Sequence, residues 1–259
     1  MNNLAFLFDI DGVLTLPNTE QRKFSVIDSS LIEFLFHIHQ QNVKFAFITG
    51  RAYPWVTKFL LSKFHSFLED IPIFMEYGLT SLIYNKVTIS DSAISFRNEY
   101  FDLILSSIQQ TCQIEGVFFE PTPFVDYPDH GSLWLEKKDG MISIASNKLI
   151  SPRKVHQIVN KSIIDILDNL RIVNHHLGCD ILPKGFGKEQ AAIKSFQLLD
   201  PHKKVRHWYI FGDNESDKEM CNPFKQSTFI DTKIGASEST RKHLKSILAD
   251  LLYSSMKVY

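Results

Sequence analysis

The sequence has few cysteines, no long apolar run and no excess of charge of either sign. Its three cysteines, Cys112, Cys179 and Cys221, lie far apart without C-x-x-C spacing, which argues against a disulfide framework or a zinc site. No apolar stretch approaches the ~18 residues of a membrane-spanning helix. The opening residues MNNLAFLFDIDG lack the basic region and the cleavage site of a signal peptide. We therefore expect a cytoplasmic protein that does not bind a membrane.

The charges of the chain are nearly balanced. The 28 lysines and arginines stand against 29 aspartates and glutamates, which gives a formal net charge of -1. This balance supplies no long-range attraction for nucleic acid, so we expect no nucleic-acid partner, and an anion must be bound by local groups. We expect a monomer or a homodimer. With 259 residues and 21 phenylalanines, the chain can form one large or two modest packed domains.

Short apolar runs alternate with helical patterns at both ends of the chain. Buried strands are predicted at 4–8 and 43–48, and a capping box of Ser30 and Glu33 begins the helix between them. Near the end, a helix at 188–199 is followed by further predicted strands. Such strand–helix–strand units form parallel sheets, which bind ligands at the carboxyl ends of their strands.

The middle of the chain has a different pattern. A predicted helix is followed by strands in GVFFE and SLWLEKKDGMISIAS, then by a second helix and the strand RIVNHH, with a turn expected at 121–123. The alternating pattern of these strands is typical of an antiparallel sheet. The predicted fold class is therefore α/β, with a Rossmann-like, parallel-sheet core at residues 1–83 and 180–259 and an inserted α+β cap at 84–179.

Two carboxylates follow the first predicted strand. Asp9 and Asp11 lie two residues apart in FDIDGVLT, and the chain turns away at Gly12. Carboxylates this close repel one another unless a cation or different protonation roles separate them. A polar turn that caps the sheet explains this pair alone equally well.

Other polar groups follow the remaining strands or begin helices. The second strand ends in ITGR, where Thr49 offers a hydroxyl and Gly50 a backbone N–H to an anion. Lys188 begins the helix after PKGFG, where its charge adds to the positive helix end. Oxygen ligands for Mg²⁺ follow the strand at 207–212 in the cluster Asp213, Asn214 and Asp217. Each signal is weak alone, but their order along one sheet predicts a site for an anion and a metal ion.

In this order, DxDGVLT, ITGR, PKGFGK and GDxxSD resemble the four motifs of the haloacid dehalogenase (HAD) superfamily of phosphatases. The insert resembles the α/β cap of the sugar-phosphatase branch. The resemblance implies that Asp9 is the nucleophile and Asp11 the general acid and base. It also implies that Thr49, Gly50 and Lys188 hold the phosphoryl group. The implied Mg²⁺ site consists of Asp9, the main-chain carbonyl of Asp11 and Asp213, with Asp217 and Asn214 as support.

Within this superfamily, the trehalose-6-phosphate phosphatases are the most similar branch. GDNESD resembles their fourth motif, and WLEKKDG resembles a cap strand whose E-x-K signature faces the sugar, here Glu136 and Lys138. Asp180 and Leu182 stand where that branch has Glu and Arg. The turn Glu76-Tyr77-Gly78 resembles the E-N-G-type turn of the family, and we interpret it as a hinge or as the edge of the core. We expect His175 to be an ordinary polar residue.

The resemblance implies a hydrolase: a Mg²⁺-dependent phosphatase of a small phosphorylated metabolite, above all a sugar phosphate, that works through an aspartyl-phosphate. Two alternatives stay open. One is a phosphotransferase similar to phosphomannomutase, which returns an isomeric sugar phosphate. The other is a sensor that binds a phosphorylated ligand without turning it over.

Overall fold

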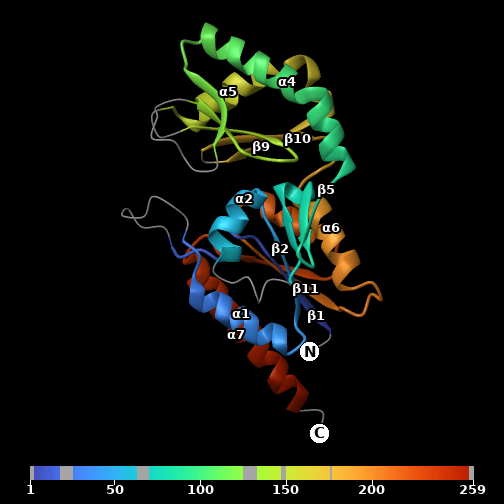
Figure 1. Cartoon of the computed structure of the whole chain (residues 1–259). Helices are drawn as coiled ribbons and strands as arrows, with labels where there is room; N and C mark the ends of the chain where they lie inside the picture. The colour runs from blue at the N-terminus through green and yellow to red at the C-terminus, as the bar shows by residue number, and fades with distance from the viewer. Residues whose placement is uncertain are drawn as a thin grey trace.

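A computed structural model of the chain describes residues 3–17, 26–62, 70–124, 133–146, 150–175 and 177–256. It contains two sheets, which lie in two parts placed one above the other in Figure 1. The lower part, the core, contains both described ends of the chain, and the upper part, the cap, contains its middle. The α/β fold class and the inserted cap are therefore as predicted.

The core sheet has seven strands in the order β12-β11-β1-β2-β3-β4-β5. The first five of these are parallel, and β4 and β5 add an antiparallel hairpin at one edge. Their bounds are β1 (Leu4–Phe8), β2 (Lys44–Ile48), β3 (Ile73–Met75), β4 (Thr80–Ile83), β5 (Lys86–Ile89), β11 (His207–Gly212) and β12 (Ser227–Asp231).

Helices cover both faces of this sheet, which is why β1 is apolar at every position. Phe6 and Phe8 pack toward the helices α1 and α7, whereas Ala5 and Leu7 pack toward α6. The helical elements of the core are α1 (Ser29–Gln40), α2 (Tyr53–Val56) with its π-helical continuation η1 (Thr57–Leu61), the short 3-10 turns η2 (Glu76–Gly78) and η4 (Glu215–Cys221), α6 (Lys188–Leu199) and α7 (Ala236–Met256).

The start of α1 differs from the prediction. Asp28, and not Ser30, is the N-cap, because its Oδ1 accepts hydrogen bonds from the backbone N–H groups of Ser30, at 3.0 Å, and Leu31, at 3.3 Å. A carboxylate two residues earlier binds the free N–H groups of the first turn, so the helix begins there.

The cap has a five-stranded sheet in the order β6-β7-β8-β10-β9. Its two long helices pack together on the face of the sheet that is turned away from the core, so the other face is turned toward the core (Figure 1). The bounds are α4 (Asp91–Ile114), β6 (Phe119–Phe124), β7 (Leu133–Glu136), β8 (Ile142–Ser146), α5 (Pro152–Ser162), the 3-10 turn η3 (Ile164–Asn169), β9 (Leu170–His175) and β10 (Gly178–Pro183).

The sheet pairings continue beyond the predicted domain limits. The core sheet includes β5, which ends at Ile89, and the cap sheet includes β10, which ends at Pro183. The turn expected at 121–123 is wrong, because these residues lie in β6 at the edge of the cap sheet. A proline at an edge removes no hydrogen bond from an inner strand. Within the described ranges, none of the helices has the length and apolar character needed to cross a membrane.

Candidate active site

The parallel strands bring the predicted acidic motifs together at the carboxyl edge of the core sheet. Phe8 of β1 is in register with Phe211 of β11, so Asp9 and Asp213 follow neighbouring strand ends. Lys188, at the start of α6, lies between the two motifs: its Nζ is 2.9 Å from Asp9 Oδ1 and is also paired with Asp217. All three paired side chains are buried. One lysine therefore joins the first and fourth motifs inside the protein.

Three carboxylates lie close enough to share a cation. Asp9, Asp213 and Asp217 each offer an oxygen within 4.8 Å of the others. Burial raises the pKa of Asp9 well above its ordinary value, and Asp217 and Asp11 raise it further against the opposing effect of Lys188. Burial, followed by the charge of Asp217, raises the pKa of Asp213 to about 6. This excess of buried negative charge and the all-oxygen donor set fit Mg²⁺.

Within this group, Asp217 is engaged on both sides. One oxygen is paired with Lys188, and Oδ2 accepts the backbone N–H groups of Asp213, at 2.8 Å, and Asn214, at 2.9 Å. The amide of Asn214 in turn donates to Asp213 Oδ1, at 2.5 Å. Asp217 and Asn214 therefore shape the loop that presents Asp213, which leaves Asp9 and Asp213 as the side chains best able to bind a metal ion.

The chain must pass close to Asp213 at Gly12. Gly12 has a φ of 68°, and a Cβ there would lie 2.2 Å from Asp213 Oδ2. Only glycine adopts this backbone conformation without strain and leaves room for the carboxylate. The turn after Asp11 in the first motif thus requires its glycine.

Asp11 points away from the acidic group and toward Arg51. The guanidinium holds both carboxylate oxygens, with Nε 2.8 Å from Oδ2 and Nη2 3.0 Å from Oδ1. Such a bidentate pair fixes the orientation of the carboxylate. The metal role predicted for the main-chain carbonyl of Asp11 stays a prediction. The sequence reasoning used only the backbone of Arg51, although its place directly after Gly50 puts the side chain in the site.

The second motif forms the opposite wall of the same site. Thr49 follows β2, is buried, and its hydroxyl oxygen accepts the backbone N–H of Arg51, at 3.1 Å. A Cβ on Gly50 would lie 3.2 Å from the ring of Tyr77, so the backbone is closely covered there. Thr49, Gly50 and Lys188 all line one cavity with Asp9, which is the arrangement that phosphate binding requires.

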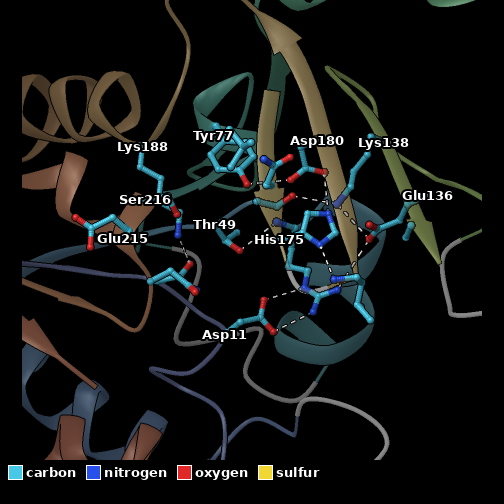
Figure 2. Close-up of a pocket in the computed structure, with 18 residues that line it drawn as sticks. Asp11, Thr49, Tyr77, Glu136, Lys138, His175, Asp180, Lys188, Glu215 and Ser216 are labelled. Carbon is cyan, nitrogen blue, oxygen red and sulfur yellow. Dashed lines mark hydrogen bonds and ion pairs between the residues drawn. The ribbon is translucent and has the colours of Figure 1, made fainter. Parts of the chain in front are cut away.

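Cap residues close this cavity. Figure 2 shows Glu136, Lys138 and His175 of the cap across the cavity from Lys188 of the core. Lys138 Nζ donates to the carbonyl oxygen of Gly50, at 3.0 Å, and lies 3.1 Å from Glu136 Oε1. The cavity has a volume of about 320 Å³, enough for a small metabolite. The predicted cap residues therefore reach the site, and Lys138 also contacts the core backbone.

Comparison with known proteins identifies the fold. The sequence matches no family model and no curated protein sequence. Among solved structures, a trehalose-6-phosphate phosphatase related protein is similar over 96% of this chain and 100% of its own, at 15% identity and a TM-score of 0.59. The C-terminal domain of the C. albicans trehalose-6-phosphate phosphatase is similar over 85% of this chain and 73% of its own, at 15% identity and a TM-score of 0.60.

The IMP-nucleotidase of Plasmodium falciparum is similar over 95% of this chain and 61% of its own, at 14% identity and a TM-score of 0.61. Each of these structures is similar to this chain over at least 85% of its residues, so the similarity includes both the core and the cap. The chain has the HAD fold. The fold implied by the four motifs is thus confirmed. The confirmation comes from similarity of structure and not from similarity of sequence.

Three residues that line the cavity of this HAD fold were not predicted from the sequence to be functional: Tyr77, His175 and Asp180. Tyr77 belongs to the turn that was expected to be a hinge or the edge of the core, and its hydroxyl donates to Asp180 Oδ2 of the cap, at 2.9 Å. His175, expected to be an ordinary polar residue, also lines the cavity (Figure 2). The position of Asp180 just before the third motif was the available signal. The sequence contains no such signal for His175, because its place depends on the pairing of β9 with β10.

Glu76 joins the HAD core to the cap through a buried carboxylate. Its oxygens accept the backbone N–H groups of Asp139, at 2.9 Å, and Gly140, at 2.5 Å, in the turn between β7 and β8. Burial raises the pKa of Glu76 to about 7; Lys138 and the two N–H groups oppose this effect, and Asp139 adds to it. Between about pH 4.5 and 7, the folded state therefore holds a proton that the unfolded state releases.

The free energy of unfolding is expected to fall as pH rises through this window, because the unfolded state binds fewer protons there. In Glu76→Gln this part of the pH dependence should disappear. Urea unfolding at pH 5 and pH 8 measures it: the wild type should lose more stability between the two values than the variant, by an amount on the order of 3 kcal/mol. Equal losses in the two proteins would contradict the assignment.

Proposed function

We propose that this protein is a Mg²⁺-dependent phosphatase that hydrolyses a small phosphorylated metabolite, foremost a sugar phosphate, through an aspartyl-phosphate on Asp9. The observation that carries the proposal is the group of Asp9, Lys188 and Asp213 at the carboxyl edge of the sheet, beneath a polar cap. Asp9 and Lys188 are buried, and Asp213 is half-buried. Asp9 and Lys188 line one small cavity, and the cation group contains Asp9 and lies next to that cavity. A nucleophile, a fixed positive charge and a cation site side by side are the parts that phosphoryl transfer needs.

In the first step, an oxygen of the Asp9 carboxylate attacks phosphorus, and the bond between phosphorus and the ester oxygen breaks. Asp11 gives its proton to the departing alkoxide, which leaves as the alcohol. In the second step, Asp11 takes a proton from water as the water oxygen attacks phosphorus. The acyl-phosphate bond then breaks, which restores Asp9 and releases inorganic phosphate.

Residues of the core would offset the negative charge of the phosphoryl group. Lys188, beside Asp9, and the Thr49 hydroxyl would bind the phosphoryl oxygens. Bound Mg²⁺, held by Asp9 and Asp213, would reduce the repulsion between the carboxylate and the phosphate. Arg51 donates one hydrogen bond to each oxygen of Asp11, which holds the carboxylate in place, and each oxygen keeps a second lone pair for proton transfer.

A polar leaving group suits the cap side of the cavity. The cap contributes a carboxylate at Glu136, an ammonium at Lys138 and an imidazole at His175, which are partners for hydroxyl groups. The names of the similar structures cover a phosphorylated sugar and a nucleotide. The polar lining supports the sugar phosphate, since a flat aromatic base would meet charged groups there.

Phosphate release from a panel of sugar, polyol and nucleotide monophosphates tests the proposal. With Mg²⁺, the wild type should release phosphate from at least one sugar phosphate. EDTA should abolish the release, and excess Mg²⁺ should restore it, because the buried carboxylates then regain their cation. An isomeric sugar phosphate without free phosphate would instead indicate a mutase, and binding of a panel compound without turnover would indicate a sensor.

A further inference from the structure

His175 and Asp180 lie on the same face of the cap sheet, the face turned toward the core. In the antiparallel pair of β9 and β10, His175 is opposite Gly178 and Asp180 is opposite Val173. Because paired positions share a face, the two side chains are diagonal neighbours. Figure 2 shows them next to one another at the cavity, which both residues line.

The hydrogen bond to His175 fixes which nitrogen carries the proton. The backbone N–H of Leu177 donates to Nδ1, at 3.3 Å, so Nδ1 is an acceptor. Burial lowers the pKa of His175 below its ordinary value, which favours the neutral ring. A neutral imidazole with Nδ1 as acceptor has its hydrogen on Nε2. Nε2 is therefore a donor.

Asp180 has one satisfied and one unsatisfied oxygen. Oδ2 accepts the hydroxyl of Tyr77, whereas Oδ1 is buried and has no hydrogen-bond partner within the described part of the chain. His175 Nε2 lies 3.8 Å from Oδ1, too far for a direct hydrogen bond. A buried carboxylate oxygen that accepts no hydrogen bond costs free energy. A bound group that donates a hydrogen bond to Oδ1 removes this cost.

We infer that one hydroxyl group of the substrate's alcohol part bridges His175 Nε2 and Asp180 Oδ1, and that this subsite selects phosphate esters of polyhydroxylated alcohols. The inference rests on the proposed phosphatase function and names the chemistry by which its substrate is chosen. An oxygen about 2.8 Å from each atom spans their separation. It accepts the proton of Nε2 and donates its own to Oδ1. An ether or a carbonyl oxygen cannot donate, and a hydrogen in its place does neither.

Tyr77 is the positioning residue of this subsite. It is a bulky residue with a φ of 58°, a backbone conformation that L side chains rarely adopt and that tends to persist at functional sites. Its ring packs over Gly50 of the phosphate-binding loop, and its hydroxyl binds Asp180 of the cap. Tyr77 thereby sets the spacing between the phosphoryl group and the hydroxyl that is recognised.

Deoxy analogues test the subsite. The parent is the preferred ester of the panel, chosen by turnover or, without turnover, by the largest rise in melting temperature. In the wild type, one monodeoxy analogue should have a kcat/KM at least about 100-fold below that of the parent, because the missing hydroxyl leaves the buried Oδ1 of Asp180 without its donor. In His175→Phe and Asp180→Asn, the ratio between these two compounds should shrink to below about 10.

The variants are chosen to change one partner each. In Asp180→Asn, Tyr77 still donates to the side-chain oxygen, so the amide NH₂ takes the place of Oδ1 and no longer accepts. Tyr77→Phe should raise KM for the parent more than it changes kcat and should also shrink the ratio, whereas a merely structural role would affect parent and analogue alike. His207→Phe, at the start of β11, is the matched control and should keep the wild-type ratio.

A binding measurement separates the inference from the proposed function. Calorimetric titration of the parent and the deoxy analogue into Asp9→Asn should show at least about 10-fold weaker binding of the analogue. Phosphate release with equal use of the parent and every analogue would overturn the subsite but leave the phosphatase. Discrimination in binding without phosphate release in the wild type would support the subsite and overturn the phosphatase. Neither release nor binding of any panel ester would overturn both.

Discussion

Replacing Asp9 by Asn is expected to lower phosphate release by at least about 10³-fold, because the amide cannot form the acyl-phosphate. The side chains are nearly equal in size, so the cavity keeps its shape. Burial raises the pKa of Asp9 well above its ordinary value, which means that the carboxylate is held at a cost. The melting temperature of metal-free Asp9→Asn should therefore be no lower than that of the wild type.

Steady-state phosphate assays on the two proteins, with the best ester of the panel and saturating Mg²⁺, measure the effect. Thermal unfolding serves as the control for folding. Glu215 is an exposed carboxylate of the same cavity. Glu215→Gln should leave the melting temperature unchanged, and it controls for the effect on the melting temperature of removing one negative charge. Undiminished phosphate release by Asp9→Asn would remove Asp9 from the mechanism.

Among the single substitutions considered above, Lys188→Met is expected to lower the free energy of unfolding the most. The ammonium lies between Asp9 and Asp217, both buried, and its removal leaves two carboxylates without their cation. Breaking a buried pair in this way costs about 3–5 kcal/mol. Urea unfolding near pH 8 should show this loss, whereas Lys242→Met, at an exposed position of α7, should change the free energy of unfolding by less than about 0.5 kcal/mol.

Metal and pH should both reduce the effect of Lys188→Met. Saturating Mg²⁺ places another positive charge on Asp9, one of the two carboxylates that lose Lys188, and close to Asp217, so the difference between wild type and variant should shrink. At low pH the carboxylates become protonated and need no partner, so the difference should shrink there as well. A loss that is independent of both would mean that Lys188 stabilises the fold only through packing.

The core was predictable because local pattern and global fold agree there. LAFLF is apolar at every position, which fits only a strand covered on both faces, and Asp9 then has to follow at the carboxyl edge. The order of the four motifs was sufficient to expect Lys188 near Asp9. The hairpin of β4 and β5 was not predicted, because Lys86–Ile89 is short and mostly exposed and therefore lacks a core-facing pattern.

The leaving-group side was less predictable because it depends on how the cap strands pair. Glu136 and Lys138 were expected at the site only because of the family resemblance. Without it, a solvent-exposed strand face would be the favoured interpretation of these two residues. His175 and Asp180 are brought together by the register of β9 and β10, which sequence patterns do not specify. Tyr77 was interpreted as part of a hinge or of the core edge, since a large aromatic at positive φ is not anticipated from a turn sequence.

The central claim, that Asp9 carries the phosphoryl group, is tested most directly by the mass of the protein during turnover. Wild-type enzyme mixed with Mg²⁺ and the best ester, and quenched in acid within a few milliseconds, should contain a fraction that is heavier by one phosphoryl group. Peptide mapping should place that group on Asp9, and Asp9→Asn should not acquire it. Phosphate release without any covalent intermediate, or a phosphoryl group on another residue, would contradict the account.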